Sequence, residues 1–542
     1  MHPAPFFDCT SRIKVPGAIA VLVAMLNGCG GGGGTQETAA RNVSPPPTSG
    51  SYAWLLKAQG STGALKYGLS LLHPNAPGIE FVVEAGSSFV TDTKAVLRGS
   101  VDAGHASVNS LAPYALLYIV GGDVRSVSLQ ANGATPSDGV QRAQSSSACS
   151  FALDAPDYAT PQNSRFVVGT AGADGQCRSA DDGHAELRFN SDGSLSFTPL
   201  TGLAPLGVVR DSATLQPLGW LLPRTLSFWD PTGAAPVTLR ANNEAAFTGL
   251  IAQTHRDALL DDGTQLSLLD VTNRATPVET RLSATTTGGG GWVAIGFDAD
   301  DYYLYRNSNT TVNASWTVLK IGRRNPTASI LASGTGQISV ASLGTNQLYV
   351  TILGTSLNTL IAISKTLGVP GKTLESTLSN TLSSVQTSAT DVHQLWRVQN
   401  IGGPNITYTV EMIDENETRL RSYSGGWPMA VAQADTQNFN TSENRTRFVF
   451  ATSYGARGFA FADASLLSYD TAARTDTPLG TLPGSSVYGN SFVFASASGG
   501  PESFMTGFAA RSDSGLLEAD SATVFSFDIA RASSLTAASS KQ

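Results

Sequence analysis

Three stretches of the chain share one pattern and decide its fold class: Leu226-Ser227-Phe228-Trp229-Asp230, Leu266-Ser267-Leu268-Leu269-Asp270 and Leu466-Leu467-Ser468-Tyr469-Asp470. Each reads as a short apolar β-strand that ends in an aspartate and a polar turn. Aspartate suits the turn because its carboxylate accepts hydrogen bonds from backbone N–H groups two residues further on. A second apolar stretch follows each turn, after Pro236, Pro277 and Pro478 respectively. Each copy therefore predicts a strand, a turn and a second strand.

Looser copies of this pattern recur along most of the chain, at residues 69–83, 116–129, 316–331, 360–374, 408–423 and 524–535. From Leu226 onward, successive copies start about 40 to 60 residues apart, which suits one four-stranded sheet per repeat. A single sheet with two apolar faces cannot bury both of them, whereas sheets stacked around an axis can. Helix signals are scarce, and only residues 372–388 can be interpreted as a helix or a loop.

These observations predict an all-β fold: one β-propeller of about seven or eight four-stranded blades over residues 51–532. Residues 52–56 are expected to close the ring by joining the last blade, and residues 533–542 to form a disordered tail. The full set of copies would give nine or ten blades, so some copies are expected to share a blade or to form a separate N-terminal β domain. Two β-sandwich domains are the alternative architecture. The resemblance is to the β-propeller superfold in general, because Trp229-Asp230 does not recur as it does in WD40 repeats.

The composition fits a protein of many short strands joined by turns and argues against nucleic acid as a partner. Charged residues make up 14% of the chain, against roughly 25% in ordinary soluble domains, and the formal net charge is −8. No cluster of lysine and arginine is present that would neutralise phosphates.

The N-terminal residues resemble a bacterial lipoprotein leader. Arg12 and Lys14 precede the apolar run of residues 18–26, which is too short to span a bilayer, and Gly28-Cys29 follows. The resemblance implies a signal peptide at residues 1–28 and a lipid, such as palmitate, on Cys29. The glycine- and proline-rich residues 29–50 would then form a tether. We expect the protein to be held by this lipid to the outer membrane, facing the periplasm or the cell surface.

Cysteine usage agrees with export. With Cys29 assigned to the lipid and Cys9 to the leader, Cys149 and Cys177 remain as a candidate disulfide, with two free thiols as the alternative. Between them and just beyond lie Asp174, Asp181 and Asp182, whose carboxylates could bind Ca²⁺ in a glycine-rich loop. A hairpin tip in which the acids only form turns is the other interpretation.

Further candidate ligand-binding residues stand in two clusters and one loop. Asp298, Asp300 and Asp301 precede a tyrosine-rich strand, in which Tyr303 and Tyr305 share one face and Tyr302 lies on the other. These acids and tyrosines could bind carbohydrate or peptide, or they could form a turn and a packed strand. His255-Arg256-Asp257 with Asp261-Asp262 could form a polar site or a hairpin turn. Trp427, between Gly426 and Pro428, could be a contact residue in an exposed loop.

No local catalytic motif is present. The sequence contains no nucleophile elbow, phosphate-binding loop or zinc helix, and its six histidines are far apart. No catalytic residue can therefore be named, and the sequence favours a protein that is not an enzyme. We expect a binding or scaffold module for an envelope protein, a glycan or another ligand. The alternative is an envelope enzyme that acts on glycan or peptide at the propeller axis.

Overall fold

The computed structural model describes residues 55–59, 67–71, 80–84, 90–101, 108–128, 141–142, 147–433, 445–452, 464–482, 486–494, 503–510, 523–528 and 533–539, without residues 192, 201, 203, 212–213, 215, 230–234, 286–289, 389 and 402–405. These residues form β-strands, turns and one short 3-10 helix, η1, at Pro161–Asn163. Among them, no helix has the length and apolar character needed to cross a membrane.

The three copies of the deciding pattern take the same place in three different sheets. Their first halves form β14 (Thr225–Phe228), β18 (Gln265–Asp270) and β34 (Ala464–Asp470), each the third strand of its sheet. Their second halves form the fourth strands, β15 (Val237–Thr238), β19 (Val278–Thr285) and β35 (Thr475–Leu482). The predicted unit of strand, turn and strand is therefore confirmed.

The turn aspartates act as the pattern predicts. Asp270 Oδ1 accepts a hydrogen bond of 2.8 Å from the backbone N–H of Thr272, and Asp470 Oδ1 accepts one of 2.9 Å from that of Ala472. Each carboxylate thus holds the chain reversal between the third and fourth strands.

Every sheet is built from strands that follow one another in the chain and pair antiparallel. The N-terminal sheets contain β1 (Leu55–Gln59), β2 (Tyr67–Leu71) and β3 (Glu80–Glu84); β4 (Val90–Val101), β5 (Val108–Val120), β6 (Asp123–Ser128) and β7 (Gln141–Arg142); and β8 (Ala148–Ala155), β9 (Arg165–Thr170), β10 (Gly183–Phe189) and β11 (Leu195–Leu200). The next sheets begin with β12 (Gly207–Arg210) and β13 (Pro217–Leu221), joined by β14 and β15, and with β16 (Gly249–Gln253) and β17 (Asp257–Asp261), joined by β18 and β19.

The remaining sheets continue the same order. They contain β20 (Val293–Phe297), β21 (Asp301–Asn307), β22 (Ser315–Gly322) and β23 (Ala328–Thr335); β24 (Gln337–Leu343), β25 (Gln347–Leu353), β26 (Leu357–Ser364) and β27 (Lys372–Leu378); and β28 (Leu382–Thr387), β29 (His393–Gln399), β30 (Thr407–Ile413) and β31 (Arg419–Ser424). The last two contain β32 (Trp427–Gln433) and β33 (Arg445–Ala451) with β34 and β35, and β36 (Ser486–Phe494), β37 (Ser503–Ala510), β38 (Thr523–Asp528) and β39 (Ser533–Ser539).

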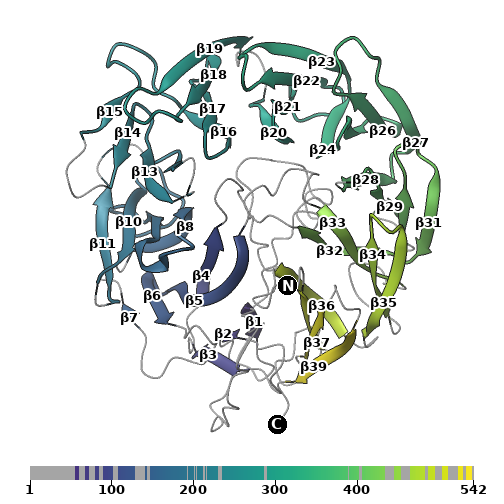
Figure 1. Ribbon diagram of the computed structural model, residues 1–542, viewed down its shortest axis with the longest axis horizontal. Coiled ribbons are helices and arrows are strands. Elements are labelled where there is room, and N and C mark those ends of the chain that lie inside the picture. The colour runs from purple at the N-terminus through teal and green to yellow at the C-terminus, as the bar shows by residue number, and fades with distance from the viewer. Residues whose placement is uncertain are drawn as a thin grey trace.

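The sheets stand around a common axis, so the predicted all-β propeller is confirmed (Figure 1). The described strands make nine four-stranded sheets and one three-stranded sheet, and the seven sheets from β8 to β35 follow one another without interruption. These seven sheets agree with the predicted seven or eight blades. The surplus copies of the repeat were expected to share a blade or to form a separate N-terminal β domain. Instead, each copy lies in a sheet of its own.

Three local predictions differ from the structure. Residues 55 and 56, the described part of the expected closing segment, belong to β1, which pairs with β2 in its own sheet. Residues 533–539 of the expected tail form β39, which pairs with β38. Residues 372–388 contain the strands β27 and β28 instead of a helix or a loop; β27 pairs with β26, and β28 pairs with β29.

The core lies between neighbouring sheets. Tyr302 and Leu304 pack on the β16–β19 sheet beside Leu268, whereas Tyr303 and Tyr305 project from the opposite face of β21 toward the β24–β27 sheet. The predicted alternation of these tyrosines is therefore confirmed. Because the second and third strands are covered on both sides, their sequences are almost continuously apolar.

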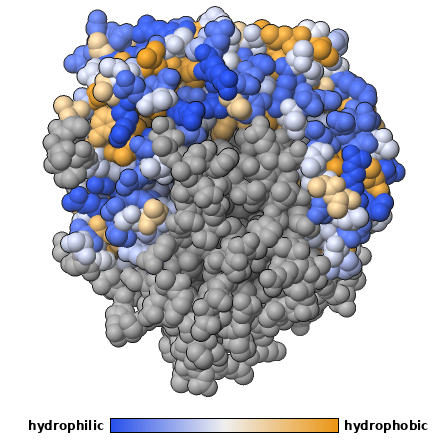
Figure 2. Space-filling model, in the orientation of Figure 1, coloured by the Kyte–Doolittle hydropathy of each residue, from blue (hydrophilic) through white to orange (hydrophobic). Residues whose placement is uncertain are grey.

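The antiparallel order gives the ring two distinct faces. Turns after the first and third strands of each sheet emerge on one face, which we call the turn face, and the turns after the second strands emerge on the other, the link face. First strands such as β16 and β20 lie toward the axis, and fourth strands such as β19 and β23 lie at the rim (Figure 1). On the face shown in Figure 2, the described surface is mostly hydrophilic, with separate hydrophobic areas.

Candidate functional site

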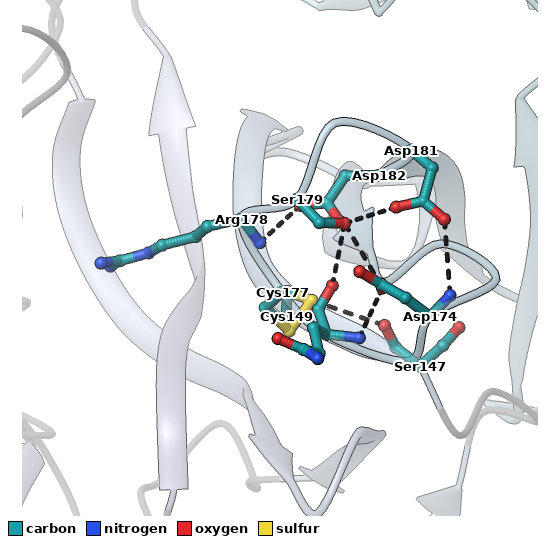
Figure 3. The surroundings of a disulfide bond; sticks show 9 residues. Ser147, Cys149, Asp174, Cys177, Arg178, Ser179, Asp181 and Asp182 are labelled. Atoms are coloured by element: carbon teal, nitrogen blue, oxygen red, sulfur yellow. Dashed lines mark hydrogen bonds between the residues drawn. A yellow bond between two sulfur atoms is a disulfide. The ribbon is translucent and has the colours of Figure 1, made fainter.

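The predicted pair of cysteines forms a disulfide. Cys149, in β8, is bonded to Cys177, in the loop between β9 and β10, with the two Cα atoms 5.7 Å apart. The loop lies on the link face, and the bond ties it to the first strand of its own sheet (Figure 3).

The acidic residues of this loop accept hydrogen bonds from backbone N–H groups and a serine hydroxyl of the same loop. Asp181 Oδ2 accepts a hydrogen bond of 2.7 Å from the N–H of Ala173, and Asp182 Oδ2 accepts one of 2.6 Å from that of Arg178. The hydroxyl of Ser179 lies 2.5 Å from Asp181 Oδ1 and 2.8 Å from Asp182 Oδ1, and this contact lowers the pKa of both carboxyl groups (Figure 3). Asp174 Oδ1 accepts from the N–H of Gln176 at 2.8 Å.

These contacts are those of a turn. Among the described residues, no group of three or more histidine, cysteine, aspartate or glutamate side chains is arranged to hold a metal ion. Calcium binding by Asp174, Asp181 and Asp182 stays a prediction.

The predicted cluster around His255 is divided by a strand. Asp257 begins β17 and Asp261 ends it, so the two carboxylates stand at opposite ends of an extended segment and on opposite faces of the ring. Asp262 instead accepts from the buried guanidinium of Arg240, at 3.4 Å. His255-Arg256-Asp257 and Asp261-Asp262 therefore form no single site.

Asp257 instead contacts residues of the neighbouring β20–β23 sheet, which also contains the predicted cluster around Asp298. Asp257 Oδ1 accepts hydrogen bonds from the hydroxyls of Tyr302 (2.5 Å) and Thr254 (2.7 Å). Its Oδ2 lies 3.0 Å from Nε of Arg323, whose Nη1 donates to the carbonyl of Asp298 at 2.6 Å. Burial, and then the charge of Asp257, raise the pKa of Tyr302 well above its usual value.

Asp298 forms the centre of the next junction. Its Oδ2 accepts from the Tyr303 hydroxyl at 3.0 Å and binds Lys365 Nζ at 2.9 Å. Burial alone would raise the pKa of Asp298, but the hydrogen bond and charge of Lys365 outweigh burial and lower it. Asp301 binds Lys320 at 2.7 Å.

Asp298, Asp301 and Tyr303 thus have partners within the protein, and ligand binding by them stays a prediction. Tyr303 is only 1% exposed, and the carboxylates are paired with lysines, so the cluster is a polar junction that fastens three sheets together. Asp300 points to solvent beside Arg324. Trp427 begins β32 instead of lying in a loop, and its side chain lies outside the described structure.

One cavity in the described structure, of about 1190 Å³, was not predicted. It lies on the turn face, across the sheets that contain β9, β13 and β14 and up to the turn after β18. We call it the arginine–tryptophan cleft, after the basic and aromatic residues Arg165, Arg188, Phe228, Trp229 and Arg274; amides also line it, on Gln162, Asn163, Asn190, Gln216 and Asn273.

The position of Trp229 is fixed by stacking and ion pairing. The guanidinium carbon of Arg165 lies 4.5 Å from the Trp229 ring centroid, and the Trp220 ring meets Trp229 edge-on at 4.9 Å. Glu186 orients both neighbours: it binds Arg165 at 2.7 Å and accepts from the Trp220 indole N–H at 2.6 Å. The Trp229 indole N–H is buried and has no hydrogen-bond partner among the described residues.

A second, smaller cavity of about 320 Å³ lies on the turn face between the β24–β27 and β28–β31 sheets. We call it the tyrosine–histidine pocket, and it is lined by Thr345, Asn346, Gln347, Tyr349, Asp391, His393, Glu415 and Asn416. The Tyr349 hydroxyl lies 2.8 Å from His393 Nε2. Burial lowers the pKa of His393 to about 4, so its imidazole is neutral at pH 7.

Neither cavity is lined by a first strand of a sheet, so both lie between sheets instead of at the axis where the sequence placed an enzyme site. Sequence reasoning missed both because each is assembled from turns of different sheets. Trp229 was visible in the sequence, but only as a repeat residue. His393 was visible only as one of several scattered histidines.

Comparison with known proteins supplies no family. No protein-family model matches the chain, and no curated protein matches it. Similar solved structures include oligogalacturonate lyase in complex with manganese (10% identity, 64% of this chain and 82% of that chain, TM-score 0.29). Others are puromycin hydrolase (10%, 70% and 52%, TM-score 0.33) and dihydro-heme d1 dehydrogenase (11%, 82% and 76%, TM-score 0.34).

These likenesses correct one prediction and assign no reaction. The sequence favoured a protein that is not an enzyme, but a lyase, a hydrolase and a dehydrogenase are among the structures to which the chain is similar. At about one tenth identity, the similarity concerns the propeller fold alone.

Proposed function

We propose that this protein is a lipid-anchored propeller of the bacterial cell envelope that takes an acidic glycan chain into the arginine–tryptophan cleft. The observation that carries the proposal is the Arg165 guanidinium, 4.5 Å from the Trp229 ring centroid, in a cavity of about 1190 Å³. The proposed location in the cell envelope depends on the leader-like residues before Cys29.

The chemistry of the lining supports a sugar ligand. Sugar rings present C–H faces that pack on aromatic rings such as Trp229, and their hydroxyl groups pair with the side-chain amides of Gln162, Asn163 and Asn273. The volume exceeds that of ordinary small-molecule pockets, so the cleft suits several linked sugar units.

The charge of the lining supports an anionic ligand. Among the described residues, three arginines and no acidic residue line the cleft, although the whole chain has a formal net charge of −8. Glu186 neutralises Arg165, whereas Arg188 is exposed and its Nε donates to the Ser196 hydroxyl at 3.0 Å. Arg274 lies 3.8 Å from Asp211, at a half-exposed site. Arg188 and Arg274 can therefore reach the carboxylates of a uronic acid chain.

The test compares an oligouronate with a neutral oligoglucan of the same length, by calorimetry on the mature chain. We expect the oligouronate to bind at least ten times more tightly, and binding to weaken as salt is added. The double variant Arg188→Gln/Arg274→Gln should lose most of this preference. Arg324→Gln, which removes an exposed arginine from the turn face at another sheet, is the matched control and should change nothing.

Equal binding of the two sugars, or tighter binding of a polyglutamate peptide, would overturn the proposal. Mass spectrometry of the incubated oligouronate measures turnover in the same samples. Products that gain the mass of water identify hydrolysis, and products whose masses sum to that of the substrate identify elimination.

A further inference from the structure

The tyrosine–histidine pocket contains a buried hydrogen-bonding pair with an unused atom. Tyr349 is 3% exposed and His393 is 2% exposed, and their hydrogen bond uses Nε2 of the imidazole. Nδ1 of His393 is buried and has no hydrogen-bond partner among the described residues. Buried polar atoms are rarely left without a partner, so this atom indicates a place for a ligand or a solvent molecule.

Two carboxylates of the same pocket are also unengaged. Asp391 and Glu415 have no hydrogen-bond or ion-pair partner within the described part of the chain. Two neighbouring acids differ from them: Asp414 Oδ1 accepts from the N–H of Thr418 at 2.8 Å, and Glu417 binds Lys372 Nζ at 2.5 Å. The pocket therefore contains two acids that neither hold a turn nor neutralise a base.

The charge and the size of the pocket indicate that a ligand would be small and positively charged. No lysine or arginine is among the lining residues, and the side chains other than the two acids are neutral amides, hydroxyls and the imidazole. Because burial lowers the pKa of His393 to about 4, the imidazole does not repel a cation at pH 7. The volume of about 320 Å³ is at the lower end of the range for small-molecule sites.

We propose that the tyrosine–histidine pocket binds the primary ammonium group of a small amine. An ammonium group carries three N–H donors and no acceptor, which matches a pocket with two free carboxylates and further oxygen acceptors. A compact ammonium fits a narrow pocket better than a planar guanidinium, which needs a flat, two-pronged partner. The site is separate from the arginine–tryptophan cleft and does not depend on the glycan proposal.

The probe is putrescine, with 1,4-butanediol as the neutral molecule of the same length, measured by isothermal titration calorimetry on the mature chain. We expect putrescine to bind and butanediol to bind at least tenfold more weakly. Glu415→Gln and Asp391→Asn should each weaken putrescine binding by about tenfold. Asn tolerates the left-handed backbone of Asp391 (φ 55°), so Asp391→Asn should keep the local fold.

Asp300→Asn is the matched control, because Asp300 is an exposed acid on the same face, outside the pocket. It should leave putrescine binding unchanged, and the thermal midpoints of all variants verify that they are folded. Equal binding of butanediol, binding that neither pocket variant weakens, or no binding of putrescine at millimolar concentration would each overturn the proposal. Imidazole ¹⁵N spectra of His393 provide a second measurement, because its resonances should move on addition of putrescine and not of butanediol.

Discussion

Arg323, just after β22, binds Asp257, the first residue of β17, across the boundary between two sheets, with 3.0 Å between Nε and Oδ2. Both side chains are about nine-tenths buried, and Tyr302 and Thr254 donate to the other carboxylate oxygen. We expect Asp257→Asn to lower the free energy of unfolding by about 3 kcal/mol, because it leaves a buried arginine without its counter-charge. Urea unfolding followed by tryptophan fluorescence measures the change.

The exposed pair Asp300–Arg324 provides the contrast. Its side chains are 67% and 82% exposed and 3.4 Å apart, so solvent screens their attraction. Asp300→Asn should change the free energy of unfolding by less than about 0.5 kcal/mol. If the two variants lose equal stability, the buried junction does not fasten the sheets as described.

Acidification should destabilise the protein through His393. Burial lowers the pKa of His393 from 6.5 to about 4, so the unfolded chain takes up the proton at a higher pH than the folded chain does. The stability from this residue is therefore fully present above pH 6.5 and is lost as the pH falls toward 4. The total loss should reach about 3 kcal/mol.

The pH dependence of His393→Gln isolates this effect. Thermal midpoints of the wild-type protein and the variant should converge between pH 6.5 and pH 4, because glutamine does not titrate in this range. Parallel curves for the two proteins would show that His393 does not carry the dependence.

The disulfide should stabilise the sheet that contains it. Cys149 and Cys177 are 28 residues apart, and closing a loop of this length contributes about 3 kcal/mol. The double variant Cys149→Ala/Cys177→Ala should lower the free energy of unfolding by that order. Addition of dithiothreitol should lower the wild-type midpoint and leave the variant unaffected; equal sensitivity of both proteins would contradict this account.

Cys29 lies outside the described residues, and its lipidation stays a prediction from the leader. Cys29→Ala in the full chain should remove the lipid and shift the protein from the membrane fraction to the soluble fraction. Mass spectrometry of the N-terminal peptide and cell fractionation measure the two effects. A variant that partitions with membranes as before would refute the anchor.

Local patterns predicted the fold because each sheet is made of neighbours in sequence. The turn aspartates Asp270 and Asp470 and the alternation of Tyr302 and Tyr303 depend only on nearby residues, and the structure confirms them. The blade number was harder to predict, since a repeat pattern does not show whether two copies share a sheet.

The cavities could not be predicted, because they depend on which turns the ring brings together. Tyr349 and His393 are 44 residues apart and meet only because β25 and β29 are second strands of adjacent sheets. The acidic cluster around Asp298 looked like a binding site for the opposite reason. Its charge was visible in the sequence, whereas Lys365, which neutralises it, is 67 residues away.

The consecutive order of strands in every sheet also shapes how the chain can fold. The sheet from β20 to β23, for example, is complete within residues 293–335, so it needs no distant segment to satisfy its backbone hydrogen bonds. Sheets can therefore form one after another as the chain is synthesised, each offering its apolar face to the next. Junctions such as Asp257–Arg323 and Asp298–Lys365 form only once two or three sheets exist. In the growing chain, these ion pairs would therefore fix the position of a sheet only after its neighbouring sheet has folded.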